Sequence, residues 1–201
     1  ALTYLAWHNW MRKSQKIYSN YHLFKIPYIY VDSLDKLETM SSGFVCFDEL
    51  WTQIDARTTS TKRNKIVGDI LLKSRKRELT IVFTAQLLDL LDKRVRKIQD
   101  FTAYPILNRT ETLTKVLVFR TGYPREDSLM KSFYFKTPLI FDCFDTHEEI
   151  SMELESNEEA KIIFQESKDD PPKFFDTYEQ CSDYALKYWE KNINKFAPLI
   201  L

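Results

Sequence analysis

The spacing of hydrophobic positions changes along the chain, and each spacing predicts a different element. Apolar residues recur at helical intervals over Leu2–Lys13. Short apolar runs predict strands over Lys16–Tyr21 and Tyr28–Val31, and Ser33 is expected to cap a short helix. The chain is therefore expected to open on a helix, two short strands and a second helix.

The middle of the chain alternates between strand and helix patterns. Apolar runs predict strands over Phe44–Phe47 and Leu79–Thr84, and a strongly basic helix from about Lys62 to Glu78 separates them. Strands joined by a crossover helix run parallel, with helices on the faces of the sheet. This part of the sequence therefore predicts an α/β fold with a mostly parallel sheet.

A further helix is expected over Leu87–Gln99, and three strands follow it. Their expected ranges are Phe101–Leu107, Thr114–Thr121 and Lys131–Phe135. A run of strands after an α/β unit commonly completes the sheet with antiparallel edge strands. We therefore expect these three strands to extend the parallel sheet.

The composition changes near Thr146, where acidic residues become frequent. Asp169–Pro172 has the composition of a linker, and Thr177–Asn192 fits a short amphipathic helix. We therefore divide the chain into a main domain over 1–149 and an acidic, partly helical extension over 150–201.

Composition excludes several classes of protein. Of the 201 residues, 44% are hydrophobic, which is enough for a substantial core. The 29 basic and 29 acidic residues balance to a net charge of +0, so any contact with nucleic acid has to come from a local patch. Cys46, Cys143 and Cys181 are odd in number and widely spaced, which indicates reduced thiols and a cytoplasmic location. No apolar run has the length of a membrane span, and the three histidines are too scattered to indicate a metal site.

The apolar run Gly43–Phe47 ends in two adjacent carboxylates, Asp48 and Glu49. In an open α/β sheet, the residues just beyond the carboxyl end of a strand are the ones that reach a ligand. P-loop ATPases place a magnesium-side acid next to a catalytic base in this way. The pair therefore indicates nucleotide hydrolysis, and the alternative is an ordinary strand that leaves the core.

A phosphate-binding loop needs several glycines, and this chain contains only three. The sequence has no GxxxxGK[ST] motif, and its opening helix resembles the helix that follows such a loop. We expect the first strand and the Walker A loop to lie upstream, in a longer protein of which this chain is a fragment. If the loop is truly missing, we expect negligible ATP turnover.

Five short segments follow one another in an order that is more specific than any one of them alone. They are Gly43–Trp51 with its acid pair, Asp55–Arg57, Lys62–Lys65, Leu71–Arg77 and Ile81–Gln86. This order resembles the HerA/FtsK-type P-loop ATPases, especially viral DNA-packaging and zonula-occludens-toxin-like ATPases. The resemblance covers roughly residues 1–149 and implies a RecA-like P-loop NTPase sheet.

The resemblance implies a role for each matching polar residue. Asp48 would correspond to the Walker B aspartate that holds Mg²⁺, and Glu49 would polarise the attacking water. As neighbours on a strand, the two would face opposite ways and serve different ligands. Gln86 would correspond to the polar sensor of the γ-phosphate, and its alternative role is a strand-end amide in solvent.

Ring ATPases of this kind complete their site with an arginine from the neighbouring subunit. Arg75 and Arg77 close the basic helix and are the first candidates, and Arg94 and Arg96 are the second. Arg57 is a further candidate in a loop that the pattern does not place. For each of them, the alternative is a solvated basic helix end, and the basic helix as a whole would also suit contacts with nucleic acid phosphates.

Taken together, the resemblance implies an ATP- and Mg²⁺-dependent motor that moves or packages DNA for a virus or mobile element. It also implies a homo-oligomeric ring, such as a hexamer, in the cytoplasm of the host cell. The alternative is a non-catalytic assembly or nucleic-acid-binding module on a degenerate ATPase scaffold.

Overall fold

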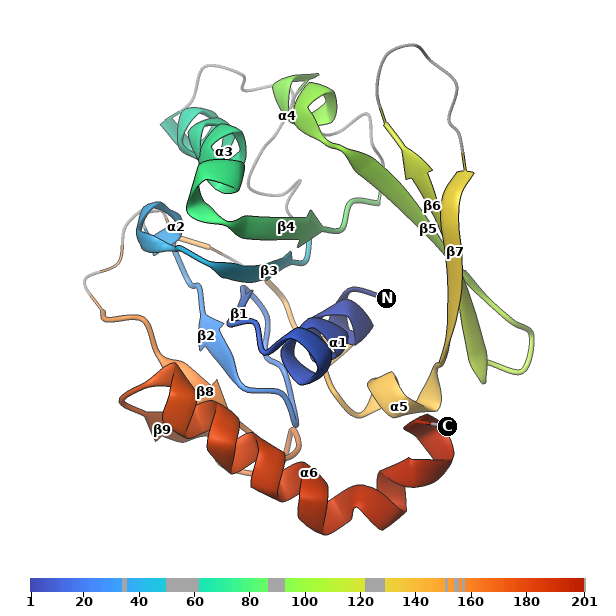
Figure 1. Ribbon diagram of the computed structural model, residues 1–201. Coiled ribbons are helices and arrows are strands. Elements are labelled where there is room, and N and C mark those ends of the chain that lie inside the picture. The colour runs from blue at the N-terminus through green and yellow to red at the C-terminus, as the bar shows by residue number, and fades with distance from the viewer. Residues whose placement is uncertain are drawn as a thin grey trace.

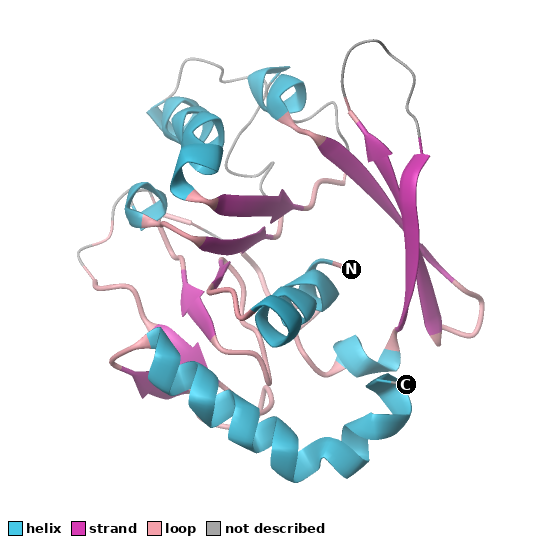
Figure 2. Ribbon diagram, in the orientation of Figure 1, coloured by secondary structure: helices cyan, strands magenta, loops and turns pink. Residues whose placement is uncertain are grey.

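The computed structural model describes the backbone of residues 1–33, 36–49, 62–86, 93–121, 129–150, 152–153, 156 and 158–200. It contains a central six-stranded sheet, a separate three-stranded sheet and helices on both faces of the central sheet (Figures 1 and 2). The helices are α1 (Leu2–Lys13), α2 (Lys36–Thr39), α3 (Lys62–Lys73), α4 (Lys93–Ile98), α5 (Pro138–Phe141) and α6 (Tyr178–Ile200).

The central sheet has the strand order β4-β3-β1-β2-β8-β9. Its strands are β1 (Ile17–Ser19), β2 (Tyr28–Tyr30), β3 (Gly43–Phe47), β4 (Leu79–Phe83), β8 (Ile162–Phe164) and β9 (Lys173–Phe175). The first four pair in parallel, β8 pairs antiparallel with β2, and β9 pairs antiparallel with β8. The expectation of an α/β fold with a mostly parallel sheet and antiparallel edge strands is thus met, but by other edge strands than the sequence suggested.

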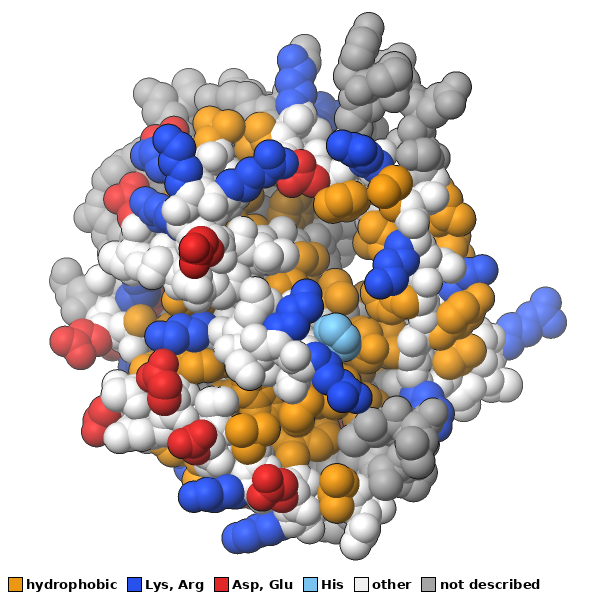
Figure 3. Space-filling model, viewed as in Figure 1, with side chains coloured by type: hydrophobic (Ala, Val, Ile, Leu, Met, Phe, Trp, Pro, Cys, Tyr) orange, Lys and Arg blue, Asp and Glu red, His pale blue; other side chains and the backbone are white. Residues whose placement is uncertain are grey.

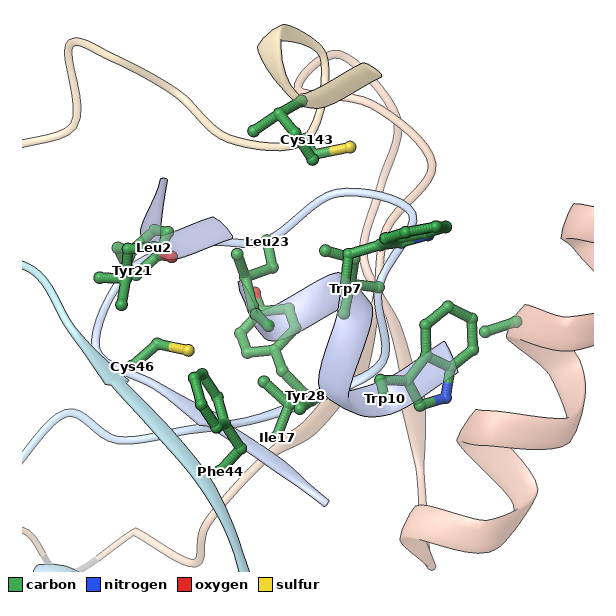
Figure 4. Packing of buried hydrophobic residues seen from close by; sticks show 14 of the residues in the cluster. Leu2, Trp7, Trp10, Ile17, Tyr21, Leu23, Tyr28, Phe44, Cys46 and Cys143 are labelled. Carbon is green, nitrogen blue, oxygen red and sulfur yellow. The ribbon is translucent and has the colours of Figure 1, made fainter. Parts of the chain in front are cut away.

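Strand β3 is buried on both faces, as a central parallel strand requires. Phe44 and Cys46 face one core, together with α1 and α6 (Figure 4). Val45 and Phe47 face a second core, which includes Ile70 of α3 and residues from α4 and β4. Every side chain of the run Gly43–Phe47 is therefore used inside the protein, which is why the run is apolar throughout.

The three strands after residue 100 form a sheet of their own, which corrects the expectation that they extend the central sheet. They are β5 (Phe101–Leu107), β6 (Leu113–Arg120) and β7 (Leu129–Lys136), paired antiparallel in the order β5-β6-β7. The ring of Tyr4 in α1 stacks on Phe135 at a centroid distance of 4.2 Å. This sheet therefore packs against α1 and does not continue the edge of β4.

The carboxyl-terminal part of the chain packs into the same core as α1. Strand β8 pairs with β2, and α6 buries Cys181, Ala185 and Trp189 in the cluster that also holds Trp7 and Trp10. Asp169–Pro172, expected as a linker, lies in the connection between the paired strands β8 and β9. The amphipathic helix expected over Thr177–Asn192 is present and is longer than predicted.

Three local expectations are also modified. Ser33 forms an isolated bridge with Glu153, and its buried hydroxyl makes no hydrogen bond within the described residues, so it does not cap α2. The basic helix ends as α3 at Lys73, and a 3₁₀ turn over Ser74–Arg77 follows. The polar stretch Asp55–Thr61 and the first part of the helix expected over Leu87–Gln99 lie outside the described residues.

The three cysteines are free, as the sequence suggested, and all three are buried. Burial raises the pKa of the Cys143 thiol to about 12 and that of the Cys181 thiol also to about 12. Among the described residues, no helix combines the length and apolar character that crossing a bilayer requires.

Candidate functional site

The acid pair lies at the edge of the central sheet where the parallel strands end. Asp48 and Glu49 follow β3 directly, Asn20 follows β1, and Thr84 follows β4. Because β1, β3 and β4 are parallel neighbours, their carboxyl ends meet at one edge of the sheet. The four side chains therefore lie together, although up to 64 positions separate them in the sequence.

Asn20 holds the main chain of Asp48 from both sides. The Asp48 N–H donates to Asn20 Oδ1 over 2.8 Å, and Asn20 Nδ2 donates to the Asp48 carbonyl oxygen over 3.0 Å. The Asn20 side chain is 1% exposed, so water does not compete for these bonds. The backbone of Asp48 is thus tied to the end of β1.

Thr84 connects the two acids through one hydroxyl group. Its O–H donates to Asp48 Oδ1, and its oxygen accepts the Glu49 N–H over 3.0 Å. The Thr84 N–H donates to the carbonyl oxygen of Phe47 over 2.9 Å, so the backbone of Thr84 is itself held by β3. The hydroxyl therefore has a defined position between the carboxylate of one acid and the peptide of the next.

Glu49 has an unusual backbone conformation. Its φ is 49°, in the left-handed region that a residue with a Cβ enters at a cost of about 1–2 kcal/mol. Gln86 Nε2 donates to Glu49 Oε1 over 3.3 Å, so the two side chains are in contact. Asp48 and Glu49 sit in a bend after β3, so their directions come from this bend and not from the alternation of a strand.

The amino end of α1 reaches the same edge of the sheet. Leu2, in the first turn of α1, belongs to the same buried cluster as Cys46 of β3. The hydroxyl of Thr3, in the first turn of α1, hydrogen-bonds to the hydroxyl of Tyr21 over 3.1 Å. Free N–H groups at the start of α1 and the positive end of its dipole therefore lie near the acid pair.

The arginines expected to act in trans are not part of this cluster within the same chain. Arg75 and Arg77 precede β4, at the opposite end of that strand from Thr84, about 15 Å away by the rise of a strand. Arg75 donates to Asp100 Oδ1 over 2.5 Å, and both side chains are exposed. Arg96 lies on α4, whereas Arg57 and the side chain of Arg94 fall outside the described residues.

Sequence reasoning missed Asn20 and Thr84. Both are short polar residues directly after strands, and at that position they resemble ordinary turn residues. The sequence did contain one indication: each residue directly follows a short apolar strand, and both strands pair with β3. Their importance depends on strand order, which the sequence does not state.

Oxygen ligands at this edge would suit a magnesium ion. Mg²⁺ binds through one or two carboxylates, hydroxyls and retained waters, and Asp48 and Thr84 supply such oxygens side by side. Within the described part of the chain, no three His, Cys, Asp or Glu residues are grouped as a metal cage. The geometry thus fits a metal held jointly with water and phosphate oxygens.

No family model matches the sequence, and a search of curated proteins finds no match. Among solved structures, the fold is similar to the N-terminal domain of zonular occludens toxin from Neisseria meningitidis. The two chains are 17% identical over 65% of this chain and 80% of the other, with a TM-score of 0.44. A similarity of this extent assigns neither a family nor an activity.

Proposed function

We propose that Asp48 and Glu49 form the acidic half of a site that hydrolyses ATP with Mg²⁺. One observation carries the proposal: the adjacent acids follow a strand that is buried on both faces, and the first turn of α1 reaches the same edge of the sheet through the hydrogen bond between Thr3 and Tyr21. A helix amino end favours phosphate, and acids beside it favour a metal that binds the same phosphate. Asn20 and Thr84 add support, since their hydrogen bonds hold the two acids in place at this edge of the sheet.

Asp48 is the metal-side residue in this proposal. Its carboxylate is held by the Thr84 hydroxyl, and its backbone is held by Asn20, so the oxygens keep one direction. A bound Mg²⁺ would neutralise charge on the phosphate oxygens. Thr84 would turn its hydroxyl between the carboxylate and the metal.

Glu49 is the residue that orients and polarises the attacking water. Its left-handed backbone turns the side chain out of the strand direction, and Gln86 holds one carboxylate oxygen. The amide of Gln86 carries no charge, so it positions Glu49 without removing its ability to accept a proton. The pair would thus place a base and a neutral donor on the same side of the substrate.

The phosphate-binding part of the site would lie at the start of α1. The chain has no GxxxxGK[ST] motif, so the residues on hand supply only the metal and water side. In the wider proposal, hydrolysis drives a homo-oligomeric ring that moves DNA, and Arg75 or Arg77 of a neighbouring copy completes the site. Exposure of Arg75 supports this role, since a residue that acts in trans has to reach another subunit.

ATP binding and hydrolysis by the natural full-length protein test the proposal. Glu49→Gln should lower the hydrolysis rate by about 100-fold or more while ATP still binds, because only the base is lost. Asp48→Asn and Thr84→Val should weaken the binding of Mg²⁺, so hydrolysis should need a higher Mg²⁺ concentration. Thr84→Ser should behave as wild type. Asp183→Asn and Glu190→Gln, both exposed on α6, are charge-matched controls and should change nothing.

A wild-type protein that binds ATP but shows no turnover, or a Glu49→Gln variant with unchanged turnover, would contradict the catalytic proposal. Failure to bind ATP at all would favour the alternative of a non-catalytic assembly module on the same scaffold.

A further inference from the structure

In the three-stranded sheet, β6 and β7 bury residues on one face, whereas β5 is exposed along its length apart from the half-buried Thr102. Thr114, Val116 and Phe135 face α1 and are buried, and Tyr4 stacks on the Phe135 ring. Directly opposed residues of antiparallel strands point to the same face, and neighbours along a strand point to opposite faces. The residues that alternate with this buried set therefore form the outer face.

The outer face carries three aromatic rings among aliphatic residues. The pairs Ile106↔Lys115, Tyr104↔Leu117 and Lys115↔Tyr134 place these side chains in rows, and Phe119 continues the β6 row beyond Leu117. Tyr104 is 49% exposed, Ile106 50% and Tyr134 54%, which is unusual for residues of this size in the middle of strands. A sheet face with such side chains in solvent indicates a binding surface.

The charges on this sheet have one sign. None of the residues in β5, β6 and β7 is Asp or Glu, whereas the strands contain Lys115, Arg120, Lys131 and Lys136. Figure 3 shows hydrophobic and basic side chains over these strands, at the right of the view, and no acidic ones. The whole chain has a net charge of +0, so this positive sheet is a local feature and complements an anionic partner.

We propose that the outer face of the β5–β7 sheet binds single-stranded DNA. Bases would stack on Tyr104, Phe119 and Tyr134, and Lys115 and Lys136 would contact phosphates. Stacking on aromatic rings together with cations along the backbone is how proteins hold single strands without reading sequence. The proposal goes beyond the nucleotide site and does not depend on it.

The rings are already arranged for this use. Tyr104 and Phe119 meet edge to face at 5.6 Å, which leaves the exposed face of Tyr104 open to a base. Lys115 Nζ lies over one face of the Tyr134 ring, 5.5 Å from its centre, so a base would stack on the other face of the ring and Lys115 would contact a neighbouring phosphate.

A second copy of the chain fits this surface less well. Three strands of about seven residues cover roughly 300 Å², whereas a stable dimer needs about 800 Å² on each partner. Two copies placed face to face would also bring their lysines together. Strand addition at the β5 edge is interrupted by Pro105, which has no N–H to donate.

Fluorescence anisotropy with a labelled oligo(dT), in the absence of ATP and Mg²⁺, tests the proposal. Tyr104→Ala and Tyr134→Ala should each weaken binding by about tenfold, because each removes one stacking ring. Tyr134→Phe should bind as wild type, and Tyr134→Leu should not, since stacking requires the ring and not the hydroxyl or apolar bulk. Phe174→Ala, which removes a ring that is 60% exposed on β9, is the matched control.

Salt dependence gives a second readout. Each phosphate contact on a single strand contributes about −0.7 to the slope of log K against log salt, so Lys115→Gln should reduce the slope by about that amount. Lys191→Gln on α6 should leave it unchanged. Thermal unfolding of each variant checks that the fold is intact. The substituted side chains are exposed, so we expect the unfolding temperature to change little.

Several outcomes would overturn the proposal. They are the absence of oligo(dT) binding, binding that ignores the tyrosine substitutions, tighter binding of the duplex or of oligo(U), and a dimer in solution that buries Tyr134. Because the assay contains no ATP, loss of ATP hydrolysis in Glu49→Gln should leave DNA binding unchanged, so the two proposals can fail separately.

Discussion

Asn20 and Asp48 are joined by a reciprocal pair of hydrogen bonds between the side-chain amide of one and the peptide groups of the other. These two bonds connect the chain after β1 to the chain after β3, as backbone hydrogen bonds connect the strands themselves, although both strands have already ended. The side chains beyond this point leave the sheet with a fixed direction. The acid pair therefore begins from a rigid base, although it lies in a bend.

Replacing Asn20 is expected to lower stability more than its size suggests. Asn20→Ala removes both partners of the partly buried N–H and C=O groups of Asp48, which should cost about 1–3 kcal/mol in total. Asn20→Asp should lose more at neutral pH, since a carboxylate cannot donate to the Asp48 carbonyl and adds charge beside two acids. Urea unfolding measures both changes. Asn194→Ala, exposed on α6, should stay within about 0.5 kcal/mol of wild type, and an equal loss there would contradict the assignment.

Two glycines should respond to alanine in opposite directions. A Cβ at Gly43 would lie 2.7 Å from the Lys16 carbonyl oxygen and 2.7 Å from a carbon of the Tyr18 ring. Gly43→Ala should therefore lower the free energy of unfolding by about 1–3 kcal/mol through overpacking. Gly68 lies in α3, and a Cβ there would meet no described atom within 4 Å, so Gly68→Ala should raise the free energy of unfolding by about 0.5–1 kcal/mol. Denaturant midpoints of the two variants on the same side of wild type would contradict this packing.

The stability of the protein should depend on pH through His8. Burial lowers the pKa of His8, and the nearby charges of Lys13, Arg12 and Lys131 lower it further. The unfolded chain then binds the proton more readily than the folded chain does. The contribution of neutral His8 to stability is therefore fully present above about pH 6.5, and it is lost as the pH drops below that value. Unfolding temperatures at about pH 7.5 and about pH 5.5 measure the loss, which His8→Gln should reduce. His147→Gln, in an exposed turn, should not reduce it.

The sequence predicts the parallel half of the fold well, because buried parallel strands leave a clear pattern. Gly43–Phe47 is apolar on both faces and ends where the acids begin. The order of residues therefore predicts both the strand and the position of the acid pair at its end. Gln86, which the resemblance made a candidate sensor, lies beside Glu49 because it follows β4, the strand that pairs with β3.

The remaining features depend on contacts between distant segments. The pattern of β5–β7 is that of any antiparallel meander, and only the stacking of Tyr4 on Phe135 decides that it covers α1. Pro171 and Pro172 suggest a linker by composition, yet the pairing of Ile163 with Phe174 makes the segment part of a hairpin. Asn20 acquires its role from the neighbourhood of β1 and β3, which no local pattern encodes.

The last helix, α6, packs over the first helix, α1. Trp10 Nε1 donates to the Ser182 hydroxyl over 2.9 Å, and the Ile17 N–H donates to the Tyr178 hydroxyl over 3.1 Å. These contacts join residues that are 172 and 161 positions apart. During synthesis on the ribosome, α1 would thus emerge long before α6 can cover its tryptophans. The apolar surface of α1 would stay exposed during that time, and we expect a chaperone to bind the nascent chain until α6 has been made.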